Sequence, residues 1–299
     1  MIINKIIKNK LPLKEYCGNF VGEEYITEAL GLFPEQNKLV ETLIDICYDM
    51  FRFGINEKKV NFKVGDFIKG VNLKLEVMPE MSFLKSTKAE FWGVKDDYLC
   101  ISVIISRFDK NSLTKEQLLY KIASCITHEL NHGYVFLSKF YNNNIIEEVP
   151  TYYHACLKIY NDDSIDDNIR DLCYILYSTY NFEIQAMVPQ VYQELRGYFE
   201  MTQEEFNIDN FKKALKKTNT YWTYYSGLNF DIPKIETYLS DKNNLNYVLK
   251  IFKEFNLQMS SKELLNKIKS AKDIYTNTLK DISRCAMAYY FEKTENYGK

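Results

Sequence analysis

127-THELNHGYVF-136 is the stretch that decides the fold, because it places two histidines one helical turn apart inside a long apolar repeat. Before it, Thr114 and Gln117 form the pattern of a capping box, in which each side chain bonds the other residue's backbone amide. Apolar residues then recur at helical spacing, namely Leu118, Ile122, Ile126, Leu130 and Tyr134. The sequence therefore predicts a helix over roughly 115–140 whose apolar stripe faces the core.

His128 and His132 flank Glu129 in the pattern H-E-x-x-H, and they are two of only 3 histidines in 299 residues. Residues four apart lie on one face of a helix, so both imidazoles can reach one cation while Glu129 lies beside them. Both histidines could instead be core residues, but a chance pairing is rare in a chain with so few of them. We therefore predict a metal site here, and zinc is the ion that suits this pattern.

A catalytic zinc site needs three protein ligands and a fourth position for water, so the sequence has to supply one more ligand. The extended metzincin motif would place glycine and histidine where the chain has Val135 and Ser138, which excludes that class. A glutamate on a following helix is the main alternative. Three further residues stay open as the third ligand, namely Glu147, Glu148 and His154.

Downstream of the histidines, Glu183 and Ala186 form an E-x-x-A pattern. Together with H-E-x-x-H, it resembles the gluzincins, zinc metallopeptidases whose third ligand is a glutamate on a later helix. The resemblance covers roughly residues 98–197 and implies one Zn²⁺ per chain, held by the two histidines and Glu183. It departs from the thermolysin-like members at Met187, where they carry a carboxylate that orients the first histidine.

The resemblance implies hydrolysis of peptide bonds, with a peptide or protein as the substrate. Glu129 would take a proton from the attacking water and pass it to the leaving amine. The oxyanion needs a further donor, and the candidates are Tyr177, Tyr180, Tyr192 and His154.

The alternative is a structural or interaction protein, such as a virion component, with a zincin fold and a vestigial or structural metal site. The intact Glu129 favours the enzyme, because this residue holds no metal.

Short alternating segments between Val60 and Ile105, separated by turn residues, predict a small sheet of three or four strands. Helical periodicity before and after this region predicts long helices. We therefore expect an α+β, mainly helical fold with a zincin-like catalytic core, made of the sheet, the H-E-x-x-H helix and the glutamate-ligand helix. Within it, 98-YLCISVII-105 fits the edge strand that gluzincins place beside the cleft, but it could equally be an ordinary core strand, and the sequence leaves both interpretations open.

The expected organisation has three parts with soft boundaries. It consists of an N-terminal helical segment over 1–57, the catalytic core over 58–200 and a C-terminal helical region over 201–299. No repeat or low-complexity linker separates them, so they could form one unit.

Composition limits the classes of partner and compartment. Lys plus Arg (38) nearly balances Asp plus Glu (40), without a long basic run, so we expect no nucleic-acid partner. We expect no membrane partner either, because neither a signal peptide nor an apolar segment of about 18 residues is found. The 7 cysteines are scattered without CxxC pairs, as in reducing compartments. We therefore predict a cytoplasmic protein, with virion association as an alternative, and the bias toward Lys, Asn, Ile and Tyr suggests a bacterial or phage source.

Overall fold

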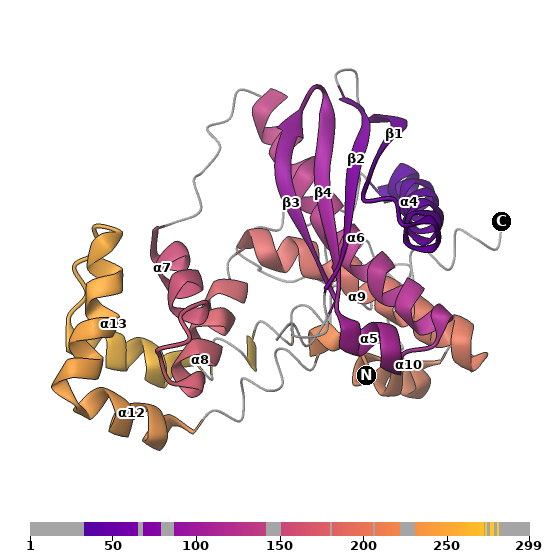
Figure 1. The fold of residues 1–299 in the computed structure, drawn as a ribbon. Helices are drawn as coiled ribbons and strands as arrows, with labels where there is room; N and C mark the ends of the chain where they lie inside the picture. Colours follow the sequence, from indigo (N-terminus) through magenta and orange to yellow (C-terminus); the bar gives the residue numbers. More distant parts are fainter. Residues whose placement is uncertain are drawn as a thin grey trace. The chain divides into compact units, whose positions relative to one another are not determined.

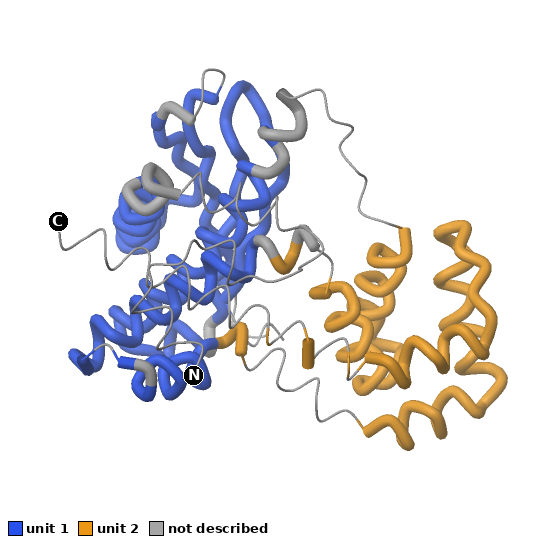
Figure 2. Tube along the Cα trace, turned by 180° about the vertical axis from the view of Figure 1, so that it is seen from behind, with its two compact units in different colours: residues 1–144, 185–218, 285–299 blue, residues 145–184, 219–284 orange. Residues whose placement is uncertain are grey.

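The structure is a computed structural model, and it describes residues 33–64, 68–78, 87–141, 151–179, 181–205, 207–221 and 231–271, together with 273, 276, 277 and 280. The described part is mainly helical with one small sheet, which confirms the α+β, mainly helical prediction. The chain divides into two compact units, with residues 1–144, 185–218 and 285–299 in unit 1 and residues 145–184 and 219–284 in unit 2 (Figure 2). The three-part organisation predicted from the sequence stays a prediction.

Unit 1 contains a four-stranded mixed sheet with the strand order β1-β2-β4-β3 (Figure 1). The strands are β1 (Glu57–Val64), β2 (Ile68–Val77), β3 (Lys88–Lys95) and β4 (Tyr98–Ile105). β1 pairs antiparallel with β2, β2 parallel with β4, and β4 antiparallel with β3. The close pairing of β1 and β2 requires Gly70, since a Cβ there would lie 1.9 Å from the carbonyl oxygen of Val60.

The prediction that β4 is the edge strand is wrong, because β4 lies between β2 and β3 and pairs with both. Its nearly continuous apolar sequence is typical of an interior strand, whose two edges are both bonded. The edge strands are β1 and β3, and a two-residue turn joins β3 to β4. Below, the edge strand is β3. Both turn residues, Asp96 and Asp97, have positive φ (53° and 65°), as a type I′ hairpin requires.

Two long helices cover one face of this sheet and bury the core of unit 1. They are α4 (Phe33–Phe53) and α6 (Lys115–Tyr141), so the helix predicted over roughly 115–140 is confirmed. The predicted capping box starts α6, since the Thr114 amide donates to Gln117 Oε1 (2.9 Å) and the Gln117 amide to Thr114 Oγ1 (3.3 Å). The core between helices and sheet includes Leu43, Met50, Leu73, Leu99, Ile101, Ile126 and Leu130.

Unit 1 also contains further helices. They are α5 (Arg107–Ser112), α10 (Ile208–Leu215) and the part of α9 (Asn181–Thr202) that follows residue 184. α9 approaches α6 closely, since a Cβ on Gly197 would lie 2.6 Å from the ring of Tyr120. It also contacts α4 through Arg196, whose Nη1 lies 3.0 Å from Glu41 Oε1. The second half of α9 is therefore anchored to both long helices.

Unit 2 is helical in its described part, as predicted for the C-terminal region. Its helices are α7 (Thr151–Tyr160), α8 (Asp167–Ser178), α12 (Ile232–Ser240) and α13 (Lys242–Glu254), followed by helical residues 261–271. α7 packs against α8 and α13, and α12 packs against α13 and α8. The apolar side chains buried on these helices include Ile159, Leu172, Leu176, Ile235, Val248 and Phe252.

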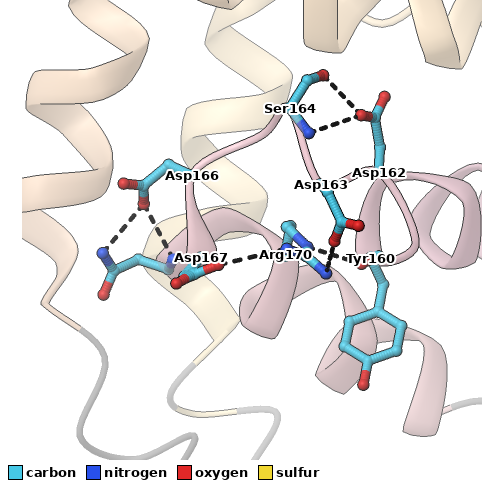
Figure 3. Close-up of polar contacts among 8 residues, drawn as sticks. Tyr160, Asp162, Asp163, Ser164, Asp166, Asp167 and Arg170 are labelled. Carbon is cyan, nitrogen blue, oxygen red and sulfur yellow. Dashed lines mark hydrogen bonds and ion pairs between the residues drawn. The ribbon is translucent and has the colours of Figure 1, made fainter. Parts of the chain in front are cut away.

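The connection between α7 and α8 is held by an arginine and a helix cap (Figure 3). Arg170 Nε donates to the carbonyl oxygen of Tyr160 (2.9 Å), and its Nη2 lies 2.8 Å from Asp163 Oδ1. Asp166 is the N-cap of α8, where its Oδ1 accepts from the Asn168 amide (2.9 Å). The Asp163 and Asp166 carboxylates therefore bind groups at the start of α8 and stabilise the connection.

Candidate metal centre

The two motif histidines lie side by side on one face of α6. Their Nε2 atoms are 3.0 Å apart, and their ring planes meet at 87° with centroids 4.6 Å apart. Both side chains are buried, with 8% (His128) and 6% (His132) of their surfaces exposed. The two imidazole nitrogens are within hydrogen-bond distance of each other, and both could bind one cation.

Glu129 completes a compact group of three possible ligands. One ligand atom from each of His128, Glu129 and His132 lies within 4.8 Å of the others. Glu129 also contacts the sheet. The backbone amide of Phe91 on β3 donates a hydrogen bond to Glu129 Oε2 over 2.8 Å. This group could hold a metal ion, and the half-buried Glu129 carboxylate lies beside the two histidines.

The approach of α6 to the sheet depends on a glycine that directly follows His132. A Cβ on Gly133 would lie 3.2 and 3.3 Å from the methyl carbons of Leu99 and 3.4 Å from the Phe91 ring. These distances are tighter than most Cβ contacts, so a larger residue would push α6 away from β3 and β4. Gly133 therefore keeps Glu129 within reach of the edge strand.

Cys125 lies one turn before His128, in surroundings that disfavour the thiolate form of its side chain. Desolvation raises the pKa of its thiol to about 12, and the negative charge of Glu194 adds to this effect. Its Sγ lies 3.6 Å from the carbonyl oxygen of Thr87. Since metals bind the thiolate, a thiol that stays protonated is a poor donor.

Glu183, the predicted third ligand, lies in the first turn of α9 and is 7% exposed. Its Oε1 accepts a hydrogen bond from Tyr177 Oη (2.7 Å), and the amino end of the helix favours its negative charge. Glu183 belongs to unit 2, whereas the histidines belong to unit 1. Its role as a metal ligand therefore stays a prediction.

Tyr177 has a neighbour that the sequence did not indicate. We considered it as an oxyanion donor, but its hydroxyl contacts the predicted ligand Glu183. Hydroxyl groups often orient carboxylate ligands in this way. The two residues are six apart across a helix boundary, which gives no periodic signal in the sequence.

The remaining candidates have the following places. His154 is exposed on α7 and stacks on Phe255, with ring centroids 6.5 Å apart. Tyr192 is buried in α9. Tyr180, Glu147 and Glu148 lie outside the residues that the structure describes. Catalytic or ligand roles for these residues stay predictions.

No protein-family model matches the chain, and neither does any curated protein or solved structure. The resemblance to gluzincins therefore rests on the motif residues themselves. Among the described residues, no helix combines the length and the apolar character needed to cross a membrane.

Proposed function

We propose that the protein is a zinc-dependent peptidase of gluzincin type. The observation that carries the proposal is the group on α6, in which one carboxylate oxygen of Glu129 and a nitrogen of each histidine lie within 4.8 Å of one another. This arrangement gives a buried cation site and a base next to it. Such a combination is what metal-assisted hydrolysis requires.

The donor set fits zinc. Bond lengths of about 2.0–2.1 Å in a tetrahedral site place two nitrogens about 3.3 Å apart. The Nε2 atoms of His128 and His132 are 3.0 Å apart, so they need to separate by only a few tenths of an ångström. Glu183 stays the third ligand that the resemblance to gluzincins implies, and its Oε1 accepts a hydrogen bond from Tyr177 Oη.

In the proposed reaction, the metal and the residues around it would have separate roles. Zinc supplies a Lewis acid that polarises the peptide carbonyl and makes a bound water more acidic. The Glu129 carboxylate would take a proton from the attacking water as a bond forms to the carbonyl carbon, and would deliver that proton to the nitrogen as the C–N bond breaks. The Phe91 amide holds one oxygen of this carboxylate during both steps.

Metal content and cleavage of a diverse peptide library test the proposal together. We expect about one zinc per chain in the wild type and in Glu129→Gln, and a loss of cleavage by about 10²–10⁴-fold in the variant. Glu116→Gln, an exposed glutamate on the same helix, is the matched control and should keep full activity. Glu183→Gln should lower zinc affinity.

The outcomes separate the proposal from its alternative. Stoichiometric zinc without cleavage by the wild type would favour a structural or interaction protein with a metal site. A wild type that binds no zinc would contradict both readings. Full activity of Glu129→Gln would show that this residue is not the base.

A further inference from the structure

The edge strand contributes a backbone group to the candidate site. Phe91 lies opposite Ile101 in the β3–β4 ladder, yet its N–H donates to Glu129 Oε2. In an antiparallel pair, amides alternate between the partner strand and the opposite side. The Phe91 N–H therefore faces the free edge of the sheet, where Glu129 reaches it from α6.

We propose that the Phe91 amide is a positioning group of the peptidase, which holds Glu129 in the orientation needed for proton transfer. The inference rests on the proposed function. One carboxylate oxygen, Oε2, accepts the 2.8 Å hydrogen bond, and in the proposed reaction Oε1 would take the proton of the attacking water. A glutamate side chain has several rotatable bonds, and a charge-assisted hydrogen bond reduces the number of orientations it samples.

A β-bulge directly after Phe91 fixes which amide faces Glu129. Trp92 and Gly93 together lie opposite the single residue Cys100, and Gly93 adopts φ 99°. A bulge pins the register of the pair and bends the strand, and bulges are frequent beside active sites. A shift by one residue would move the side chains of β3 to the other face of the sheet and would turn the Phe91 amide toward β4, away from Glu129.

Close packing at Gly133 on α6 also supports the hydrogen bond between Phe91 and Glu129. Gly133 is four residues after Glu129, so the two share a face of α6, and its missing side chain lets that face approach Phe91 and Leu99. Gly133 on α6 and the bulge in β3 thus both favour contact between the Phe91 amide and the Glu129 carboxylate. The hydrogen bond from Phe91 to Glu129 therefore depends on how α6 packs against β3 and β4.

The direct test replaces the Phe91 amide by an ester, using the α-hydroxy acid analogue of phenylalanine at position 91 in the full chain. The side chain stays, the donor is lost, and the Glu90 carbonyl becomes a weaker acceptor. The matched control is the corresponding ester at Glu90, whose amide faces β4 and whose loss removes one ladder bond without touching Glu129. Both proteins are loaded with zinc, and kcat, KM and zinc content are measured on a cleaved peptide.

We expect kcat of the position 91 ester to fall by about 10- to 100-fold, the equivalent of one hydrogen bond to a charged group. KM and zinc content should stay near the wild-type values, because neither substrate nor metal binding uses this amide. The ester at Glu90 should keep a kcat near that of the wild type. Unchanged kcat in the ester at 91, with an active wild type, overturns the proposal and leaves the proposed function standing.

A second measurement applies even if the esters do not fold. Amide hydrogen exchange of Phe91, followed by NMR, should be slow in the wild type and at least about tenfold faster in Glu129→Ala. Amides that bond β4 should exchange equally in both proteins. An equal Phe91 exchange rate in both would overturn the positioning role. Wild-type protein that binds zinc but cleaves nothing would instead overturn the proposed function, and this inference with it.

Discussion

Replacing Lys121 by methionine should destabilise the protein, because it leaves a buried carboxylate without its cation. Lys121 Nζ on α6 lies 2.9 Å from Asp109 Oδ2 on α5, and the two side chains are 15% and 4% exposed. Asp109 Oδ2 also accepts from the Thr87 amide (2.6 Å), at the residue before β3 begins. The pair therefore ties together α5, α6 and the start of the edge strand.

The magnitude follows from what Asp109 keeps after the change. Breaking a buried ion pair by removing one partner costs about 3–5 kcal/mol. Asp109 retains the Thr87 amide, which still stabilises its charge, so we expect a loss of about 3 kcal/mol in the free energy of unfolding at pH 7. The double variant Asp109→Asn, Lys121→Met removes both charges and should be less destabilised than Lys121→Met alone.

The loss should depend on pH. Burial alone raises the pKa of Asp109, but hydrogen bonds from the Thr87 amide and Lys121 outweigh it, so the pKa lies below its usual value. A carboxylate with a lowered folded-state pKa stabilises the protein above its unfolded pKa of about 3.9, and this contribution is lost as pH falls through the folded pKa. The difference between wild type and Lys121→Met should therefore be largest near pH 7 and shrink toward pH 3.

Urea denaturation of unit 1, followed by tryptophan fluorescence and circular dichroism at several pH values, measures this difference. Because the chain has 2 tryptophans and Trp92 on β3 is already 70% exposed, circular dichroism is the primary measurement. A loss below about 1 kcal/mol at pH 7, the value of an exposed pair, would refute the reasoning. So would a difference that grows as the pH is lowered.

Three further variants probe close packing and the site. Gly70→Ala should cost about 3 kcal/mol or more in urea denaturation, because its Cβ would lie 1.9 Å from the Val60 carbonyl oxygen; wild-type stability would contradict the strand pairing. Gly133→Ala, with a Cβ 3.2 Å from Leu99, should lower kcat on the order of threefold at unchanged zinc content, and an unaltered kcat would argue against the close approach. Cys125→Ala should retain its zinc in metal analysis, and loss of the metal would make Cys125 a ligand.

Local features of the sequence determined much of the fold. The bounds of α6, its capping box and the shared face of His128 and His132 all follow from interactions within a few residues along one helix. The existence of strands between Val60 and Ile105 was also predicted, because alternation of side chains is a local property. These features do not depend on what the rest of the chain does.

Only the tertiary structure decided which strand lies at the edge and what it offers the site. Alternation does not encode the pairing partner, so the apolar segment that fits an edge strand by its place in the chain is in fact the interior strand β4. The hydrogen bond from Phe91 to Glu129 has no sequence signature either, because every residue except proline carries a backbone amide. Its position is set by a bulge in β3 and by the close packing at Gly133, which exist only once helix and sheet have come together.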